Sequence, residues 1–495
     1  MAHFGKRALL FGAGAVLGAI GARWWAPALP GFPPGDRIAP TGAPGTLNDA
    51  SLLSETPVFR HDTLPDPDPS ETLRALLAEA RASGRPVAIG AARHSMGGQS
   101  IPRDGHAVTL AGTGGLIRPD PETMTYTAQG GARWSHVIAA LDPLGFSPAV
   151  MQSNNDFGLS ATFSVGAHGW AVPRGPMGAT VRAIRLMLAD GNIVTASRTE
   201  NAELFRAAMG GYGLIGLILE LTVEMVPNLR FVPTYDRMPA EDFAAAFTAA
   251  VRDPAVNMAY GRLNVDLDRF LTEALMITYR PDPDQTALPA AEGSGMMAHL
   301  ASYLYRAQLG REGMRRLRWG IEAGLNPRLS SGPVTRNSLI NEPAATLDDR
   351  NPDRVDILHE YFVDPERFGE FLTACRAIIP ASYQEFLNVT LRYVDTDAEA
   401  LLSYAPRPRI AAVMSFSQEM TRRAEADMAR MTTALIDAVL AIGGSYYLPY
   451  RPHATRDQFA RAYPGHTALI ALKREVDPGI LFRNALWDTY IGPVS

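Results

Sequence analysis

The sequence predicts an α+β fold made of two domains. At 495 residues, the chain exceeds the size at which one hydrophobic core keeps growing, so more than one domain is expected. Strand-like runs alternate with amphipathic helical stretches, a pattern typical of α+β proteins with an antiparallel sheet. The composition, with 46% hydrophobic and 20% charged residues, indicates a globular protein rather than a disordered one.

The charge and the cysteine content exclude several classes of protein. A formal net charge of −5 provides no basic surface for nucleic acid, so we expect a small-molecule partner. Cys375 is the only cysteine, which excludes an internal disulfide framework, a cysteine-rich zinc site and an iron–sulfur cluster. We predict no metal site.

Residues 1–25 predict an export signal or a short membrane anchor. Lys6 and Arg7 precede an uncharged run at 8–22, and an Arg-Trp-Trp segment follows it. This run of 15 residues is shorter than the roughly 20 that a spanning helix needs, so a cleaved signal and a retained anchor both stay open. We expect an exported protein that is periplasmic or anchored in the inner membrane. Residues 26–56, rich in proline and glycine, are expected to form a linker.

A first folded domain is expected at 57–227. Its helix signal is leucine spacing that ends before Gly84, and its hairpin signal is a pair of alternating runs joined at Asp190-Gly191. The elements expected in order are a helix at 70–83, a strand at 86–90, strands within 106–112 and 125–134, a helix at 135–144, the hairpin at 181–197 and a long strand within 210–227.

A second domain is expected at 228–450, followed by a C-terminal segment at 451–495. Four strand-like runs and two amphipathic stretches alternate here, which favours an antiparallel sheet. Polar, Arg-rich residues at 285–345, interrupted by glycine and proline, suggest a helical insertion or a mobile cover. The strands are expected at 274–281, 359–363, 386–394 and 410–417, and the helices at 365–379 and 424–442.

Three loops of small residues suggest where a ligand binds. They are GAARHSMGGQ at 90–99, GLSATFSVGAHG at 158–169 and GGYGLIG at 210–216. Such loops allow a phosphate-bearing ligand to approach the main chain and accept its N–H groups. None of the three contains a P-loop or a Rossmann glycine motif, so any phosphate is expected to bind on a different scaffold.

These loops, in this order, resemble the PCMH-type FAD-binding domain of the vanillyl-alcohol oxidase and p-cresol methylhydroxylase superfamily. VDPGILFRNALWDTYI, at 476–491, resembles the closing segment of its aldonolactone oxidase and alditol oxidase branch. The resemblance implies a two-domain flavoprotein. Its second domain would be a substrate, or cap, domain with an antiparallel sheet covered by helices, and its C-terminal segment would return to the FAD site.

The first loop matches the family pattern G-x-G-H-S, whose histidine bonds covalently to the flavin 8α-methyl group. His94 falls on that position, and Arg93 stands where many members have glycine. The alternative is that His94 only packs within a structural loop. The resemblance implies FAD contacts for Gly90, Ala91, Ala92, Arg93, His94, Ser95, Gly98, Gln99, Gly158, Ser160, Ala161, Ser164, Gly166, Gly169, Gly216, Ile218 and Asn484.

Catalytic groups are expected in two further stretches that resemble the alditol oxidase branch. One would supply Arg392 to the active site, although the acidic partner found two residues earlier in that branch is Thr390 here. The other would place Arg451, His453 or Arg456 near flavin N5, with an arginine stabilising the reduced flavin and His453 acting as base.

Two further residues are considered for the active site. Glu360 is a further pocket candidate, or an ordinary strand carboxylate, and His168 is expected to be structural rather than catalytic. The resemblance implies oxidation of a CH–OH group of a sugar lactone, polyol or related polar alcohol, with hydride transfer to flavin N5 and electrons passing to O₂ or another acceptor. The alternatives are amine oxidation like that of cytokinin dehydrogenases, and a non-catalytic periplasmic binding protein that kept a flavin fold.

Overall fold

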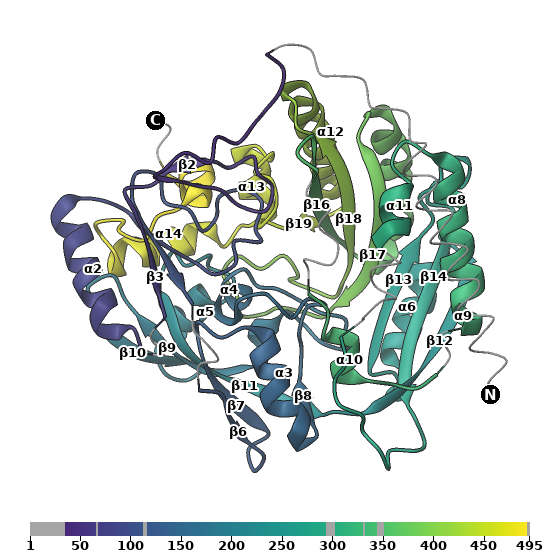
Figure 1. Cartoon of the computed structure of the whole chain (residues 1–495), viewed down its shortest axis with the longest axis horizontal. Coiled ribbons are helices and arrows are strands. Elements are labelled where there is room, and N and C mark those ends of the chain that lie inside the picture. The colour runs from purple at the N-terminus through teal and green to yellow at the C-terminus, as the bar shows by residue number, and fades with distance from the viewer. Residues whose placement is uncertain are drawn as a thin grey trace.

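The computed structural model describes residues 35–65, 68–111, 116–293, 302–329, 332–343 and 351–492. The segment predicted as a signal or anchor, 1–25, lies outside the described residues. Within the described part of the chain, no helix is both long enough and apolar enough to cross a bilayer. The α+β fold with two sheet-containing halves is confirmed (Figure 1).

A small parallel sheet begins the first half. Its strands are ordered β3 (Arg60–Leu64), β5 (His106–Leu110) and β4 (Val87–Gly90). Helix α2 (Ser70–Ser83) follows β3 and buries Leu73, Leu76, Leu77 and Ala80, as its leucine spacing predicts. Gly84 ends the helix with φ 63°, a left-handed conformation that glycine adopts without steric cost.

An antiparallel sheet of six strands completes the first half. The predicted hairpin is confirmed: β9 and β10 pair with Met187 opposite Ile193, and Gly191 in the turn has φ 90°. Helices α4 (Leu159–Ser164) and α5 (Ala202–Ala208) were not predicted. The strand order is β10 (Ile193–Ser197), β9 (Val181–Met187), β11 (Leu217–Pro227), β7 (Thr125–Gln129) and β6 (Arg118–Asp120). Strand β8 (Phe146–Pro148) also pairs with β11. Helix α3 (Trp134–Leu141) lies between β7 and β8 in the sequence.

The second half is one eight-stranded antiparallel sheet. The chain enters it just after β11, because β12 is the next strand. The order is β15 (Val334–Thr335), β12 (Arg230–Pro239), β14 (Glu273–Pro281), β13 (Met258–Leu263), β17 (Glu385–Val394), β18 (Arg409–Glu419), β16 (Arg354–Val363) and β19 (Ser445–Tyr446).

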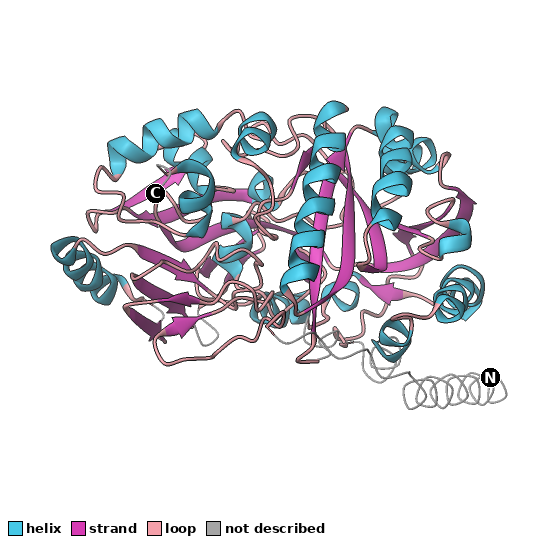
Figure 2. Cartoon of the chain, turned by 90° about the horizontal axis from the view of Figure 1, so that it is seen from above, coloured by secondary structure: helices cyan, strands magenta, loops and turns pink. Residues whose placement is uncertain are grey.

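Helices cover this sheet, and Figure 2 shows the longest of them lying along its strands. That helix, α12 (Arg422–Ala441), buries Met428, Met431, Leu435 and Val439 against the sheet. Helices α6 (Phe243–Arg252) and α11 (Phe368–Ile378) also bury one face. The described part of the 285–345 region includes α8 (Glu312–Gly320), a π-helical turn (Ile321–Leu325), α9 (Asn326–Leu329) and α10 (Arg336–Ile340).

Both ends of the described chain connect the two halves. Residues 35–56, the described part of the stretch predicted as a linker, include β1 (Thr46–Leu47), which pairs with β2 (Thr56–Pro57), and the Asp36 carbonyl accepts from the Arg422 amide at 2.8 Å. At the other end, α13 (Arg456–Ala462) and α14 (His466–Val476) precede a parallel bridge between Phe482 and Val87 of β4. The C-terminal segment therefore runs beside the edge of the small sheet (Figure 1).

Candidate active site

A pocket lies between the two halves of the molecule. It encloses about 1530 Å³ of space outside the protein atoms, part of it open to solvent. From the first half it is lined by the loop after β4 and by parts of 152–168 and 212–218. From the second half, Leu358, Glu360, Arg392, Val413 and the Tyr447–Tyr450 turn complete it.

Thirteen of the seventeen residues predicted to contact FAD line this pocket. They come from all three glycine-rich loops, so tertiary structure brings the predicted loops together. The thirteen are Gly90, Ala91, Ala92, Arg93, His94, Ser95, Gln99, Gly158, Ser160, Ala161, Ser164, Gly216 and Ile218.

The other four predicted residues, Gly98, Gly166, Gly169 and Asn484, are not among the lining residues of the pocket. The Gly98 amide donates to the Asp49 carboxylate at 2.7 Å, and the Asn484 side-chain amide donates to the Tyr212 carbonyl at 2.9 Å. The Gly166 carbonyl accepts from the Tyr404 hydroxyl at 2.6 Å. A Cβ on Gly169 would lie 2.3 Å from the Met151 carbonyl oxygen, so only glycine fits there.

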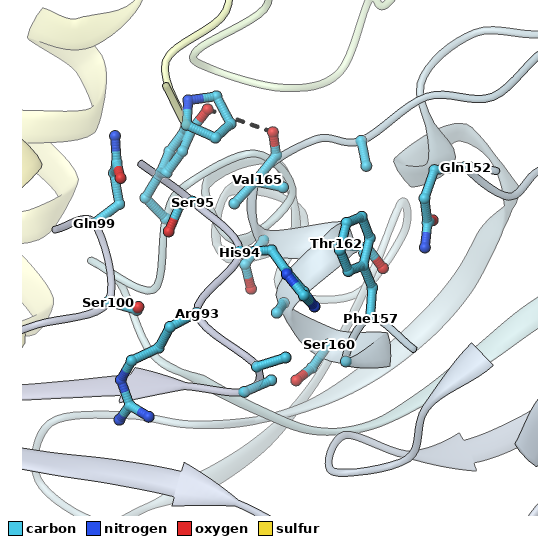
Figure 3. Close-up of a pocket in the computed structure, with 18 of the residues that line it drawn as sticks. Arg93, His94, Ser95, Gln99, Ser100, Gln152, Phe157, Ser160, Thr162 and Val165 are labelled. Carbon is cyan, nitrogen blue, oxygen red and sulfur yellow. Dashed lines mark hydrogen bonds between the residues drawn. The ribbon is translucent and has the colours of Figure 1, made fainter. Parts of the chain in front are cut away.

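The loop after β4 holds His94 in an aromatic, water-poor setting. The His94 ring lies 4.2 Å from the Phe157 ring, centroid to centroid, and Figure 3 shows the two side chains beside one another. Burial lowers the pKa of His94, so the imidazole is neutral at pH 7 and one ring nitrogen keeps a free lone pair. Such an imidazole is the form that can act as a nucleophile.

Arg93 adopts the backbone conformation for which glycine is suited. Its φ is 52°, in the left-handed region. The chain therefore keeps the loop shape although a side chain is present, and the Arg93 side chain leaves the loop on the side away from His94 (Figure 3). The loop backbone that presents His94 is thus compatible with arginine at this position.

The loop is held against the C-terminal part of the chain by several hydrogen bonds. The Gln99 side-chain amide donates to the Leu448 carbonyl at 2.7 Å and to the Tyr450 carbonyl at 3.0 Å. The Met96 amide donates to the Pro449 carbonyl at 2.7 Å. These contacts fix the loop after β4 relative to the Tyr447–Tyr450 turn, which also lines the pocket.

Buried polar side chains that contact one another also line the pocket. His168 Nε2 lies 2.5 Å from Glu360 Oε1, and the Tyr450 hydroxyl donates to Glu360 Oε2 at 3.3 Å. Glu360 and His168 are only 3% and 4% exposed. Arg392 Nη2 donates to Ser153 Oγ at 3.0 Å, and the Arg392 charge acts on Glu360. Burial lowers the pKa of Arg392 and Glu360 opposes that change.

Strand register explains why Glu360 and Arg392 face the same pocket. Thr390 on β17 lies opposite Val413 on β18, and Val413 lies opposite Glu360 on β16. Directly opposed residues project from the same face of a sheet, as do residues two apart on one strand. Glu360 therefore shares a face with Thr390 and Arg392, and it provides a carboxylate although position 390 is threonine.

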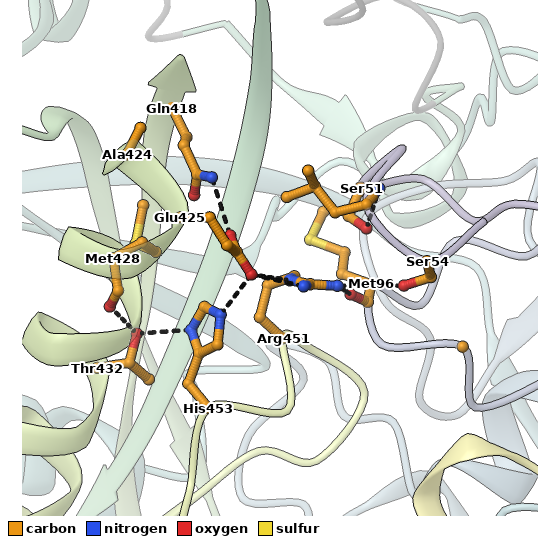
Figure 4. A network of polar contacts seen from close by, with 12 residues as sticks. Ser51, Ser54, Met96, Gln418, Ala424, Glu425, Met428, Thr432, Arg451 and His453 are labelled. Atoms are coloured by element: carbon orange, nitrogen blue, oxygen red, sulfur yellow. Dashed lines mark hydrogen bonds and ion pairs between the residues drawn. The ribbon is translucent and has the colours of Figure 1, made fainter. Parts of the chain in front are cut away.

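Arg451 and His453 do not line the pocket within the described chain. His453 Nε2 lies 2.9 Å from Glu425 Oε1, and Arg451 Nη2 donates to the same oxygen at 2.5 Å (Figure 4). His453 also contacts Thr432 on α12, which in turn contacts His359 at 3.2 Å. His359 precedes Glu360 on β16, so its side chain projects from the opposite face, and His453 lies on the α12 side of the sheet.

Arg456, the third basic candidate of this stretch, also lies elsewhere. Its guanidinium donates to the Gly492 carbonyl at 2.6 Å and to the Asp488 carbonyl at 3.2 Å. Arg451 contacts the loop after β4, because its Nη1 donates to the Met96 carbonyl at 3.1 Å. It is placed to position that loop rather than to touch a substrate.

Several observations test whether the pocket fits FAD. Gly213 lines it, and a Cβ built there would meet no protein atom within 4 Å, so the main chain is open to a ligand at this point. Buried polar atoms of other lining residues lack protein partners among the described residues: Gln152 Oε1, Tyr447 hydroxyl, Ser100 Oγ and Arg93 Nε. Buried polar groups are normally hydrogen-bonded, so these atoms fit a large polar ligand such as FAD.

Sequence reasoning missed part of the lining. Gln152, Asn154 and Phe157 stand just before the second glycine-rich loop, and Tyr447 and Tyr450 belong to a turn far along the chain. The SNND run before the second loop was a usable signal, since polar residues beside a glycine-rich loop often bind ligands. The tyrosines carried no signal, because only folding brings them to the pocket.

Comparisons with known proteins agree with this site. A family model described as "FAD binding domain" matches residues 66–197. L-gulonolactone oxidase from Bos taurus is 21% identical over 434 residues, which cover 85% of this chain and 92% of the bovine protein. L-gulonolactone oxidase from Mus musculus is 26% identical over 33% of this chain and 37% of its own length. Cytokinin dehydrogenase 7 from Oryza sativa subsp. japonica is 29% identical over 44% and 42%.

The matched residues contain strands β4 and β5 of the small parallel sheet and the first two glycine-rich loops, and the bovine alignment extends into the second half. The chain is therefore an FAD-dependent oxidoreductase, and it is similar to L-gulonolactone oxidase over most of its length.

Proposed function

We propose that this protein oxidises a CH–OH group of a sugar lactone, polyol or related polar alcohol. The observation that carries the proposal is the buried group of Arg392, Glu360 and His168 in the same pocket as the predicted flavin loops. The Arg392 guanidinium and the Glu360 carboxylate can form charge-assisted hydrogen bonds with a polar substrate, which an apolar substrate could not accept or donate. The bovine relative is named for a sugar lactone, and its alignment covers 85% of the chain, including the strands that carry Glu360 and Arg392.

The residues of the pocket divide the task of handling the substrate. Bound FAD supplies the hydride acceptor, flavin N5. Arg392 is suited to donate hydrogen bonds to a substrate oxygen and so to orient the carbinol carbon. Glu360 is suited to accept the hydroxyl proton, since its carboxylate lines the pocket and each oxygen has a second lone pair.

These steps balance the oxidation. The alcohol loses a hydride from carbon and a proton from oxygen, and the C–O bond becomes a carbonyl. His168 and Tyr450 both donate toward Glu360, which holds the carboxylate in one orientation. The two electrons leave with the hydride and pass to O₂ or another acceptor.

Anaerobic reduction of the bound flavin tests the proposal. Aldonolactones, polyols and simple alcohols are added to the purified yellow protein, and loss of the oxidised flavin absorbance is followed. Readmission of O₂ then shows whether oxygen reoxidises the flavin rapidly, as in an oxidase, or slowly, as in a dehydrogenase. A panel in which none of these alcohols bleaches the flavin contradicts the proposal.

The Glu360→Gln variant tests the assigned role. It keeps the shape of the side chain and removes its ability to accept a proton, so the rate of flavin reduction by an active alcohol should fall by about 10²-fold or more. Glu419→Gln on β18 is the matched control, because Glu419 lies on the neighbouring strand and outside the pocket lining. Equal rates for Glu360→Gln and wild type would show that Glu360 is not the proton acceptor.

Amine oxidation is the second candidate. It is favoured by the 29% identity to a rice cytokinin dehydrogenase, which extends over 44% of this chain. An N6-substituted adenine in the same panel decides between the two: flavin bleaching by this amine and by no alcohol would replace the first proposal.

A further inference from the structure

Gln152 brings an unpartnered hydrogen-bond acceptor to the pocket. Its side chain is 7% exposed and lines the pocket, and Figure 3 shows it well apart from Arg93 and Gln99. Gln152 Nε2 donates to the Asn154 carbonyl at 2.7 Å, so the amide nitrogen is held by its own loop and the oxygen is the free atom. Among the described residues, Gln152 Oε1 has no hydrogen-bond partner. A buried amide oxygen normally accepts a hydrogen bond, so a bound molecule with an O–H or N–H group is the expected donor.

Gln152 stands next to the residue that Arg392 contacts. Arg392 Nη2 donates to Ser153 Oγ at 3.0 Å. Consecutive Cα atoms lie about 3.8 Å apart, so the Gln152 side chain leaves the main chain beside this contact. Arg392 shares its sheet face with Glu360, and all four residues line the pocket. The free amide oxygen therefore belongs to the part of the pocket to which we assign the substrate.

The Tyr447 hydroxyl is a second unpartnered polar group of this part of the pocket. Tyr447 is 8% exposed and lines the pocket, and its hydroxyl has no hydrogen bond to any described residue. Its ring lies 6.1 Å from the His168 ring and 5.6 Å from the Tyr450 ring, centroid to centroid, and both of these neighbours contact Glu360. Burial raises the pKa of Tyr447 well above its ordinary value, so the phenol is protonated at pH 7 and can donate as well as accept.

The chemistry of these two groups indicates what they bind. Gln152 and Tyr447 are neutral, and the charges nearby, on Arg392 and Glu360, are opposite in sign. A neutral polar group of the bound molecule therefore suits this part of the pocket better than a second charge. A hydroxyl group can donate to the amide oxygen of Gln152 and can also donate to or accept from the Tyr447 phenol. Glu360 already takes the hydroxyl that is oxidised, so the two groups need other hydroxyls.

We propose that Gln152 and Tyr447 bind hydroxyl groups of the substrate that are not themselves oxidised. The substrate is then a neutral molecule with several hydroxyl groups, a polyol or an aldonolactone rather than a simple alcohol. An analogue that lacks such a hydroxyl leaves a buried polar atom unpaired, and this cost makes the site selective. The inference rests on the proposed oxidation of a CH–OH group and adds the residues that select the substrate.

Monodeoxy analogues test the proposal on the wild-type holoenzyme. The parent compounds are D-sorbitol and L-gulonolactone, and each is compared with those of its monodeoxy forms that keep the oxidised hydroxyl. The second-order rate constant for anaerobic flavin reduction is measured for each compound. At least one monodeoxy form should react about 10- to 100-fold more slowly than its parent. If every monodeoxy form reacts within about 3-fold of its parent, the proposal is wrong, and no variant is needed to show it.

The Gln152→Leu variant assigns the selectivity to one side chain. It removes the acceptor oxygen and nearly keeps the side-chain volume, so the parent should slow by about 10- to 100-fold. The sensitive monodeoxy form should change by less than about 3-fold, because it has no hydroxyl for Gln152 to bind. Tyr447→Phe removes one hydroxyl group and should give the same pattern at one position of the substrate.

Gln129→Leu is the matched control. Gln129 Oε1 is also buried without a partner among the described residues, but Gln129 does not line the pocket. This variant should leave the ratio of the parent rate to each monodeoxy rate unchanged.

The possible failures can be told apart. Equal slowing of the parent and of every monodeoxy form in both Gln152→Leu and Tyr447→Phe would show a structural role and overturn the proposal. A lower flavin content or a shifted flavin spectrum in Gln152→Leu, with unchanged rate ratios, would assign the amide to the cofactor and overturn it as well. Flavin reduction by neither parent compound in the wild type would contradict the proposed function itself, and this inference would fail with it.

Discussion

Glu425 is the carboxylate that accepts hydrogen bonds from both the Arg451 and the His453 side chains. It accepts hydrogen bonds from Arg451 at 2.5 Å, from His453 at 2.9 Å and from Gln418 at 2.9 Å. Arg451 and His453 are 11% and 6% exposed, so neither is well solvated if the carboxylate is removed. We expect Glu425→Gln to destabilise the second domain. It should also loosen the loop after β4, because Arg451 donates to the Met96 carbonyl of that loop.

The size of this effect follows from the burial of the partners. Loss of one partner from a fully buried ion pair costs about 3–5 kcal/mol. Glu425 is 21% exposed and glutamine still offers an acceptor oxygen, so we expect a lower cost of about 2 kcal/mol. If the second domain unfolds as a unit of about 220 residues, thermal unfolding at pH 7 should shift down by about 4–8 °C.

The pH dependence separates a charge effect from a packing effect. Burial alone would raise the pKa of Glu425, but the His453 hydrogen bond and the Arg451 charge hold it well below its ordinary value of 4.5. As the pH falls below about 4.5, the unfolded chain therefore takes up a proton that the folded protein does not, and wild type loses this stabilisation. The difference in melting temperature between wild type and Glu425→Gln should therefore become smaller as the pH is lowered.

Two results would refute the reasoning. One is an equal melting temperature for wild type and Glu425→Gln at pH 7. The other is a gap that stays constant between pH 7 and pH 4. Glu370→Gln on α11 is the control, because Glu370 is 55% exposed and loss of its solvent-screened surface pair with Arg367 should leave the melting temperature nearly unchanged at either pH.

Three further predictions follow from the pocket and its surroundings. Denatured wild type should keep flavin on the polypeptide and His94→Ala should not; free flavin from both would show a non-covalent cofactor. In Gly158→Ala the new Cβ would lie 2.3 Å from the Ala91 Cβ, so stability should fall by about 1–3 kcal/mol, with a lower flavin-to-protein ratio in the purified variant. Burial lowers the pKa of His359 to about 3, so acidification from pH 6.5 to 5 should destabilise wild type by about 2 kcal/mol, and His359→Gln should flatten this part of the denaturation profile.

Some elements could be predicted from short stretches of sequence alone. Helix α2 follows from its leucine spacing and Gly84, and the β9–β10 hairpin follows from alternation and Asp190-Gly191. Strand β12 was missed, because RFVPTYDRMP mixes prolines and charges with apolar residues. Helix α4 was missed as well, since its six residues include only two large apolar side chains, Leu159 and Phe163, which are too few to establish a helical period.

The site was predictable where ligand contacts come from contiguous loops. Gly90 to Ser95 carry their signal in the composition of one short stretch, and the loop lines the pocket. Arg93 also carried a signal, as an unusual residue at a glycine position. Only the folded structure gives the backbone angle at this position, and the φ of Arg93 is 52°, in the left-handed region.

The sequence by itself determined an FAD-type domain, an antiparallel second domain and the loops between strand and helix that hold a cofactor. Only the tertiary structure decided which polar groups meet around Glu360 in the pocket. Glu360 lies two strands from Arg392, and the register through Val413 places it on the same face. His453 is on the α12 side for the same reason, because alternate residues of β16 project to opposite faces and a strand's register is set by pairings across the sheet.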